Sequence, residues 1–164
     1  MMIRSFIPFP DKRLRTAADP VDAVTDEVRK VWTDMIDTMD AMPGVGLAAP
    51  QIGVMLRLAV VDASDTRGQA ISMANPEILH ASDLLRAHEE ASPNLPGVFA
   101  RIERPRAVTV RFLDAEGQMK TQDFVGLWAT SVQHQIDHLN GRMYIDHLSR
   151  TKREMLVKKS RKAR

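Results

Sequence analysis

QHQIDHLNG, residues 133–141, is the stretch that decides the fold, because it carries two histidines four positions apart and ends in an Asn-Gly pair typical of a helix C-terminus. We expect this helix to begin near Gly126. Its apolar stripe comprises Trp128, Val132, Ile136 and Leu139. At about 100° per residue, His134 and His138 fall on a different side of the helix from that stripe. The pattern therefore predicts a central helix with one side in the core and an imidazole pair directed at a site.

The histidine pair by itself admits more than one interpretation. Two imidazoles at this spacing can hold one metal ion, and in metallohydrolases of this pattern a glutamate follows the first histidine and activates water. Here that residue is Gln135. The pair alone is compatible with a hydrolase, with an inactivated hydrolase, and with two histidines that hold no metal.

The composition indicates one globular domain. The chain has 164 residues, of which 44% are hydrophobic and 27% charged, and no apolar run approaches the roughly 20 residues that span a bilayer. The N-terminal segment lacks the apolar core of a secretory signal, so we expect a cytoplasmic protein without a membrane partner. The absence of cysteine agrees with this, and it also removes every thiolate metal ligand and every thiol nucleophile.

Upstream of the histidines, the sequence predicts one helix and several strands. Apolar residues recur at three- or four-residue steps from Val24 to Met42, and Pro43-Gly44 ends the series. GVGLAAPQIG, residues 44–53, is too rich in glycine and alanine for a strand interior and too apolar for an exposed loop, which suits close backbone approach. We expect strands at 56–64, 69–79 and 107–117, with 119–126 completing a hairpin.

The C-terminal segment 151–164 holds much of the basic excess behind the net charge of +2, with five lysines or arginines in its last seven residues. We interpret it as a solvated terminal helix that frays. The alternative is an arm that contacts RNA or another polyanion through phosphates. No aromatic residue interleaves with these charges, so base stacking is not indicated, and we expect no specific DNA partner.

Three motifs together identify a family resemblance. GVGLAAPQIG is followed by EASPNLPG at 90–97 with an Ile-x-Arg-Pro element at 102–105, and then by QHQIDHLNG. The chain resembles the peptide deformylases, metal-dependent hydrolases that remove the formyl group from the initiating methionine of new bacterial proteins. The resemblance implies an α+β fold with antiparallel β-sheets packed around a central C-terminal helix that carries the histidine pair. Residues 1–150 would form the deformylase-like domain, and 151–164 a basic C-terminal helix or tail of the same domain.

The resemblance also implies a role for individual residues. His134, His138 and Ser92 stand at the metal-ligand positions, the last in place of the cysteine of EGCLSVPG. Gln135 stands in place of the general base glutamate, Gln51 at the position that stabilises the formyl oxygen, and Pro93 at the position that gives a backbone N–H to the same oxygen. The first motif would border the substrate at Gly44, Val45, Gly46 and Leu47.

Three of these substitutions remove what the reaction requires. A carboxamide has no basic site near neutral pH, so Gln135 cannot deprotonate water. A serine hydroxyl is far less acidic than a thiol, so Ser92 is a weak neutral ligand. Proline has no N–H, so Pro93 cannot donate to an oxyanion. We therefore expect a deformylase-like protein that is not competent for deformylation and that binds either no cofactor or a weakly held divalent metal (Fe, Zn, Ni or Co).

Three hypotheses for function follow. The first, which we favour, is a non-catalytic module that binds formyl-Met peptides or nascent chains. The second is a metal-dependent amide hydrolase of weak or altered activity, with His88 or Glu89 as the residues able to replace the missing ligand. The third is a ribosome- or RNA-associated factor acting through 151–164, since C-terminal helices contribute to ribosome contact in the family.

The neighbouring polar residues carry structural expectations. Without a metal, both imidazoles would hydrogen-bond Ser92, Gln51 or water. Asp137 would orient an imidazole or cap a neighbouring segment. Glu90 matches a family position that is usually structural. Thr130 and Ser131 are more polar than the lining expected of a pocket for a methionine side chain.

Overall fold

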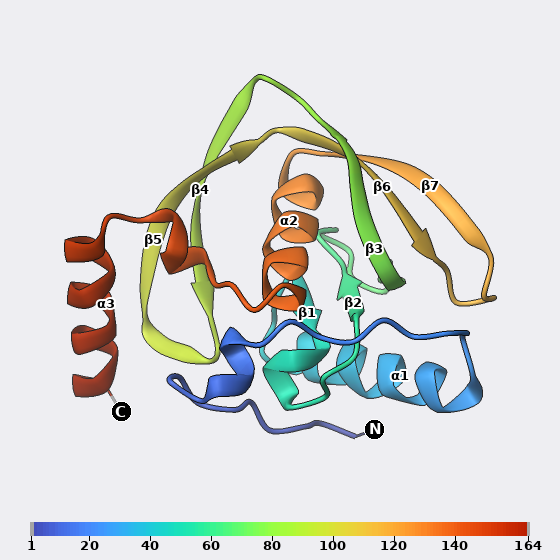
Figure 1. The fold of residues 1–164 in the computed structure, drawn as a ribbon, viewed down its shortest axis with the longest axis horizontal. Coiled ribbons are helices and arrows are strands. Elements are labelled where there is room, and N and C mark those ends of the chain that lie inside the picture. The colour runs from blue at the N-terminus through green and yellow to red at the C-terminus, as the bar shows by residue number, and fades with distance from the viewer. Residues whose placement is uncertain (1, 164) are drawn as a thin grey trace.

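Helix α2 lies at the centre of the molecule, as the sequence predicts (Figure 1). In the computed structural model, which describes residues 2–163, this helix has a five-stranded antiparallel sheet on one side and a two-stranded hairpin on the other. The long elements are α1 (Asp26–Ala41), β1 (Gly46–Ala48), β2 (Leu58–Val61), β3 (Ile71–Ala81), β4 (Leu85–Ser92), β5 (Leu95–Pro105), β6 (Ala107–Leu113), β7 (Met119–Val125), α2 (Leu127–Leu139) and α3 (Arg150–Lys162). The predicted α+β arrangement of antiparallel sheets around a C-terminal helix is confirmed.

The larger sheet has the strand order β1-β2-β3-β6-β7, and every pair in it is antiparallel. The strands expected at 56–64, 69–79 and 107–117 are present as β2, β3 and β6, with shifted ends, and β7 completes the predicted hairpin. The hairpin of β4 and β5 was not expected as a pair of strands. In its segment LRAHEEAS, charged and apolar residues do not alternate regularly, so the sequence lacks the pattern of a half-buried strand.

Helix α1 begins with a capped N-terminus and ends just before Pro43. The side chain of Thr25 accepts a hydrogen bond from the backbone N–H of Val28 at 3.2 Å, and two acidic residues occupy the first turn. Its apolar side packs against β1 and β2 in one core cluster, and α2 packs against β6 and β7 in a second. These two clusters fix α2 between the sheet and the first motif.

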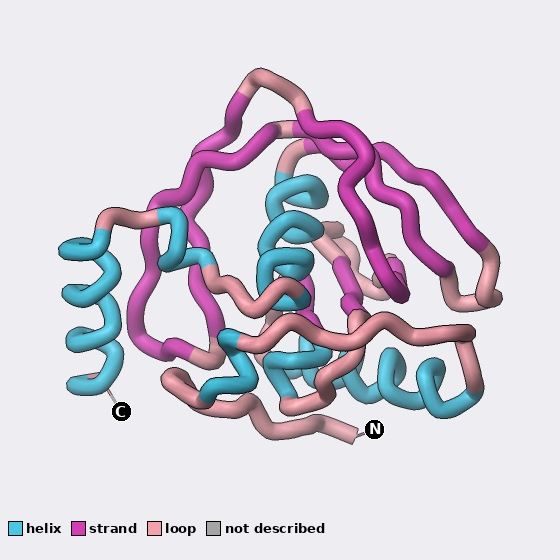
Figure 2. The backbone as a smooth tube through the Cα atoms, viewed as in Figure 1, coloured by secondary structure: helices cyan, strands magenta, loops and turns pink. Residues whose placement is uncertain are grey.

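The N-terminal segment, drawn largely as loop in Figure 2, joins three parts of the molecule that border α2. The backbone N–H of Ile7 donates to Gln51 O at 3.0 Å, that of Phe9 to Asn94 O at 2.9 Å, and that of Ala18 to Leu139 O at 2.9 Å. The first motif, the β4–β5 turn and the end of α2 are therefore tied together by this N-terminal segment.

Helix α3 packs on β5 through one side and is exposed on the others, as expected of a solvated terminal helix, although the packed side was not predicted. The hydroxyl of Ser160 is fully buried and donates to Pro96 O at 2.6 Å, and Leu156 and Val157 pack with the apolar residues of β5. The physical reason for this packing is a short apolar stripe on α3 that includes Leu156 and Val157. None of the helices formed by residues 2–163 is both long and apolar enough to cross a membrane.

Candidate functional site

A cleft of about 410 Å³ opens between the first motif, strand β4 and helix α2. The first motif contributes Gly44, Val45, Gly46 and Gln51, the hairpin contributes Ser92 and Pro93, and α2 contributes His134 and Gln135. Sequence reasoning therefore assembled one site from three distant segments. Two residues lie elsewhere. The side chain of Leu47 is fully buried in the core cluster under α1, and His138 lies beneath the cleft lining.

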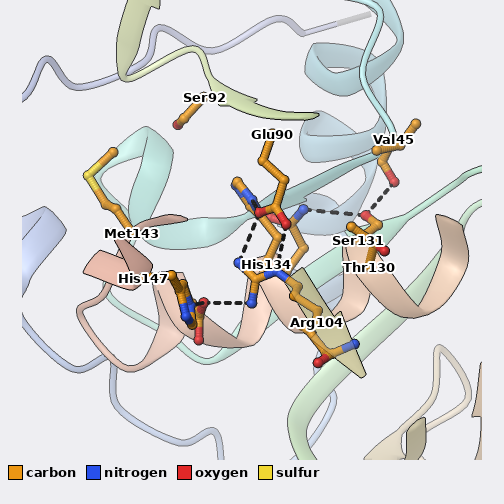
Figure 3. Close-up of polar contacts among 12 residues, drawn as sticks. Val45, Glu90, Ser92, Arg104, Thr130, Ser131, His134, Met143 and His147 are labelled. Carbon is orange, nitrogen blue, oxygen red and sulfur yellow. Dashed lines mark hydrogen bonds and ion pairs between the residues drawn. The ribbon is translucent and has the colours of Figure 1, made fainter. Parts of the chain in front are cut away.

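The two imidazoles of α2 lie next to one another, and their ring centroids are 5.0 Å apart. His134 Nδ1 is 2.8 Å from Glu90 Oε1, a contact drawn in Figure 3. The expectation for the imidazoles named Ser92, Gln51 or water, and the protein partner that His134 Nδ1 meets is instead Glu90. Glu90 points inward from β4 and occupies Nδ1 of the His134 ring. Nε2 is therefore the nitrogen that a ligand could contact.

His138 differs from its neighbour because it is fully buried and neither of its ring nitrogens has a hydrogen-bond partner within residues 2–163. Burial, followed by the nearby His134, holds the pKa of His138 well below the usual range for histidine. The ring is therefore a neutral imidazole with one unpaired donor and one unpaired acceptor.

Behind the histidines lies a network of ion pairs, which we call the frame: Glu90 and Arg104, which are buried, Asp137, which is half-buried, and His147, which is exposed. Arg104 binds Glu90 through Nε (2.6 Å) and Nη2 (2.9 Å), and it binds Asp137 through Nη1 at 2.9 Å. His147 Nε2 lies 2.8 Å from Asp137. Figure 3 shows these contacts running along one side of α2. The structural role expected for Glu90 and Asp137 is confirmed, although the imidazole held by Asp137 is His147.

Burial opposes the charged forms of Glu90, Arg104 and Asp137. Their hydrogen bonds and opposite charges outweigh this effect on the pKa of each group. Hydrogen bonds and charges from His134 and Arg104 hold the pKa of Glu90 below its usual range, and those from His147 and Arg104 lower the pKa of Asp137. The pKa of Arg104 is raised against its burial, chiefly by Glu90. Both carboxylates are therefore ionised, and Arg104 neutralises the charge next to His134.

Ser92 belongs to a second, uncharged cluster with Gln51 and Asn94. The hydroxyl of Ser92 donates to Asn94 Oδ1 at 3.2 Å, and Gln51 Nε2 donates to Asn94 Oδ1 at 2.8 Å and to Ser92 Oγ at 3.4 Å. Gln51 Oε1 accepts from the backbone N–H of Ala48 at 2.9 Å. Both amide hydrogens of Gln51 are thus directed at protein atoms, which leaves none for the oxyanion role that the family resemblance implies.

Sequence reasoning missed Asn94, which is fully buried and central to this cluster. With Pro93 it forms the turn between β4 and β5, and its Nδ2 donates to Ile7 O at 2.7 Å and to Gln51 O at 2.9 Å. A Pro-Asn pair is a turn signal. That signal could have located the hairpin, but it carries no information on which distant carbonyls the side chain meets.

Gln135 completes the cleft floor. Its Nε2 lies 3.4 Å from Ser131 Oγ, and the hydroxyl of Ser131 donates to Val45 O at 2.8 Å. Gln135 Oε1 is buried and has no hydrogen-bond partner within residues 2–163. The floor therefore presents a carboxamide where a carboxylate base would be needed.

The residues present do not fit a tightly held catalytic metal ion. Two imidazoles are available, but the third donor is the neutral Ser92 hydroxyl, whose oxygen already accepts from Gln51 Nε2 and from the backbone N–H of Asn94, each at 3.4 Å. No group of three or more His, Asp or Glu side chains suited to a metal is formed anywhere in residues 2–163. His88 and Glu89 line the cleft without joining the imidazole pair in such a group.

Comparisons with known proteins agree with this architecture. A family model described as "Polypeptide deformylase" matches residues 3–154. The peptide deformylase of Afipia carboxidovorans is 46% identical over 165 residues, covering 99% of this chain and 96% of the relative. That of Methylocella silvestris is 45% identical, covering 99% and 86%.

Solved structures show the same similarity. The crystal structure of peptide deformylase from Ehrlichia chaffeensis in complex with actinonin gives a TM-score of 0.94 at 34% identity, covering 99% of this chain and 98% of the other. A peptide deformylase from Legionella pneumophila gives a TM-score of 0.92 at 40% identity, covering 98% and 95%. The similarity thus extends over nearly the whole chain in sequence and in fold.

Proposed function

The chain belongs to the peptide deformylase family, and from that premise we propose that it binds N-formylmethionyl peptides, including those of nascent chains in the cytoplasm, without hydrolysing them. The relatives named peptide deformylase support a cleft suited to formyl peptides. One observation carries the proposal. Ser92, Pro93 and Gln135, each unable to perform the chemistry of its position, all line the same cleft.

Each position would deprive the reaction of a different contribution. Loss of a general base at Gln135 costs about 10²- to 10⁴-fold, and loss of one oxyanion donor at Pro93 about 10²- to 10³-fold. Gln51, the other expected donor, gives its hydrogens to Asn94 and Ser92. These contributions act as a unit, so they do not simply multiply. Even the smaller penalty makes this a poor deformylase.

The test combines a binding measurement with an activity measurement. The purified protein is incubated anaerobically with Fe²⁺, Ni²⁺, Zn²⁺ or Co²⁺, and formate release from formyl-Met-Ala-Ser is followed beside an active deformylase as control. We expect binding of the peptide by calorimetry and a rate far below the control. A rate equal to that of the control would contradict the proposal. Stoichiometric metal by elemental analysis, with a metal-dependent rise in Tm, would favour an altered metal-dependent hydrolase instead.

A second candidate function, contact with ribosomal or other RNA, is favoured by the outer side of α3. The exposed basic residues there are Arg150, Lys152, Lys158, Lys159, Arg161 and Lys162. Contacts to phosphates release counterions, so association should weaken steeply as salt rises. Salt-insensitive ribosome co-sedimentation, unchanged after these residues are replaced by glutamine, would contradict this candidate.

A further inference from the structure

A second pocket, of about 480 Å³, lies outside the cleft, where β4 begins, β5 passes into β6, and β7 passes into α2, at the top of Figure 1. Two backbone hydrogen bonds hold these segments together. The N–H of Arg106 donates to Leu84 O and the N–H of Gly126 donates to Arg106 O, each at 3.0 Å. The volume is in the range of sites that hold small organic molecules. We call this the arginine pocket, and it is lined by Leu85, Arg86, Arg106, Ala107, Val125 and Gly126.

The two arginines of the arginine pocket lack a counter-ion. Neither Arg86 nor Arg106 forms an ion pair with a carboxylate of residues 2–163. Arg106 is exposed, and its guanidinium has no hydrogen-bond acceptor among the same residues. Arg104, by contrast, binds two carboxylates. Two cations on one small pocket repel each other, so the arginine pocket carries positive charge that an anion would neutralise.

Arg86 is held in place by α2 before any ligand binds. Its Nη1 donates to Thr130 Oγ1 at 3.1 Å, and the arginine side chain is half-buried. A guanidinium has five N–H donors in a rigid plane, and the hydroxyl of Thr130 occupies only the Nη1 end. The remaining donors are available to an anion, and little rotamer entropy is lost when they bind it, because the side chain is already ordered.

Two large apolar side chains border the same pocket and are left in water. Leu85, at the start of β4, is 56% exposed, and Val125, at the end of β7, is 66% exposed. Single exposed apolar residues are ordinary, but these two share one pocket with a pair of uncompensated cations. An inorganic anion would leave Leu85 and Val125 in water. An anion that carries an apolar group would cover them and gain hydrophobic stabilisation.

We propose that the arginine pocket binds a small organic anion, in which one carboxylate or phosphate group is attached to a short apolar body. The anionic group lies between the guanidinium groups of Arg86 and Arg106, and the apolar body lies against Leu85 and Val125. This site goes beyond the proposed function, because none of the residues that line it also lines the cleft. Guanidinium groups pair with carboxylate and with phosphate, so the experiment compares the two head groups.

The test is a heteronuclear NMR titration of the full chain with hexanoate, hexyl phosphate, hexan-1-ol and inorganic phosphate. The first two probes should shift the backbone amide signals of Ala107 and Gly126 saturably and leave those of Gly46 and Ser131, in the cleft, unchanged. Hexan-1-ol lacks the anionic group and should bind at least about tenfold more weakly than hexanoate. Inorganic phosphate lacks the apolar body and should bind more weakly than hexyl phosphate. The tighter of the two anionic probes identifies the preferred head group.

The variant Arg106→Gln removes one cation from an exposed position, so the fold should be unaffected. It should weaken the binding of the tighter anionic probe at least about tenfold, because one charge-assisted hydrogen bond is lost. Arg101→Gln is the matched control. Arg101 is exposed on β5, belongs to neither lining, and its replacement changes the net charge by the same amount. This variant should bind the probe as wild type does.

The outcomes decide the proposal in either direction. Saturable shifts at Ala107 and Gly126 that Arg106→Gln weakens and Arg101→Gln leaves unchanged would support it. It is overturned if neither anionic probe gives saturable shifts, or if the shifts are confined to the cleft. Equal weakening by the two variants would show attraction to net charge only and would also overturn it. Binding of hexan-1-ol as tight as that of hexanoate would remove the role of the arginines, with the same consequence.

Discussion

The frame is built on the same elements as Ser92, Gln135 and His138, the residues at the family's chemical positions, which we call the reaction centre, but the two groups have opposite properties. Glu90 and Ser92 are two residues apart on β4, and Gln135 and Asp137 are two apart on α2. In the frame, every buried charge has a partner within 3 Å. In the reaction centre, Gln135 Oε1 and both nitrogens of His138 have no hydrogen-bond partner among residues 2–163.

The difference follows from what each group does for folding. Removing one member of the frame would leave a buried carboxylate or guanidinium without a counter-charge, a large cost to stability. Exchanging a thiol for a hydroxyl, or a carboxylate for a carboxamide, leaves no such charge behind. The chemistry of the cleft can therefore be lost while the fold that surrounds it persists.

The largest effect is expected from Arg104→Met, which removes the central cation of the frame. Glu90 and Asp137 would remain buried without their partner, and the free energy of unfolding should fall by about 3–5 kcal/mol. Urea denaturation measures the change. Arg111→Met is the matched control, because the ion pair of Arg111 with Glu77 is exposed on both sides and should change stability by less than about 1 kcal/mol. Similar small losses in both variants would show that the frame is not needed for stability.

The reaction centre should respond in the opposite way to Ser92→Cys, Pro93→Leu and Gln135→Glu combined. We expect stability close to wild type and, in protein supplied with Fe²⁺ or Ni²⁺, a rise in formate release of at least about 10²-fold. Adding Asn94→Ser, which restores the residue of EGCLSVPG at that position, should raise the rate further, because it frees Gln51 Nε2. No gain in either variant would mean that the cleft has lost more than these positions.

The parts that sequence predicted are those whose signal is local. The helix around His134 follows from its apolar stripe, and the place of Ser92 in the cleft follows from the motif that contains it. The β4–β5 hairpin was missed because its charged residues alternate poorly. The role of Asn94 was missed because it depends on Ile7 and Gln51, which no local pattern brings near it. The hydrogen bond between His134 and Glu90 likewise depends on how β4 lies against α2.

Asn94 belongs to the uncharged cluster with Ser92 and Gln51, and Asn94→Ala should have an intermediate effect. The change removes two donors to backbone carbonyls, those of Ile7 at 2.7 Å and Gln51 at 2.9 Å, and leaves both carbonyls buried. We expect a loss of about 1–3 kcal/mol in urea denaturation. Asn140→Ala, which removes an acceptor for Arg57 on an exposed residue, is the control and should cost less than about 1 kcal/mol. Equal losses would argue against a central role for Asn94.

The smallest effect concerns Asp62, a buried carboxylate that supports the first motif from the side away from the frame. Its backbone N–H donates to Val45 O at 2.9 Å, the oxygen that also accepts from Ser131. Its side chain accepts from Ser64 Oγ–H (2.5 Å) and from the backbone N–H groups of Ser64 and Gln69 (3.0 Å each). These donors, with the charge of Arg67, outweigh burial and lower the pKa of Asp62 below 3.8.

Because the pKa of Asp62 is lower in the folded than in the unfolded state, the unfolded chain binds the proton first as the solution is acidified. The stability contributed by its carboxylate is therefore present above pH 3.8 and is lost as the pH falls through the folded value. Asp62→Asn should lower Tm at neutral pH, and the difference from wild type should shrink as the pH falls below 3.8. Asp65→Asn, on an exposed residue of the same loop, should follow the wild-type profile. A difference in Tm between Asp62→Asn and wild type that stays constant with pH would contradict this. It would mean that the shape of the Asp62 side chain, and not its charge, stabilises the protein.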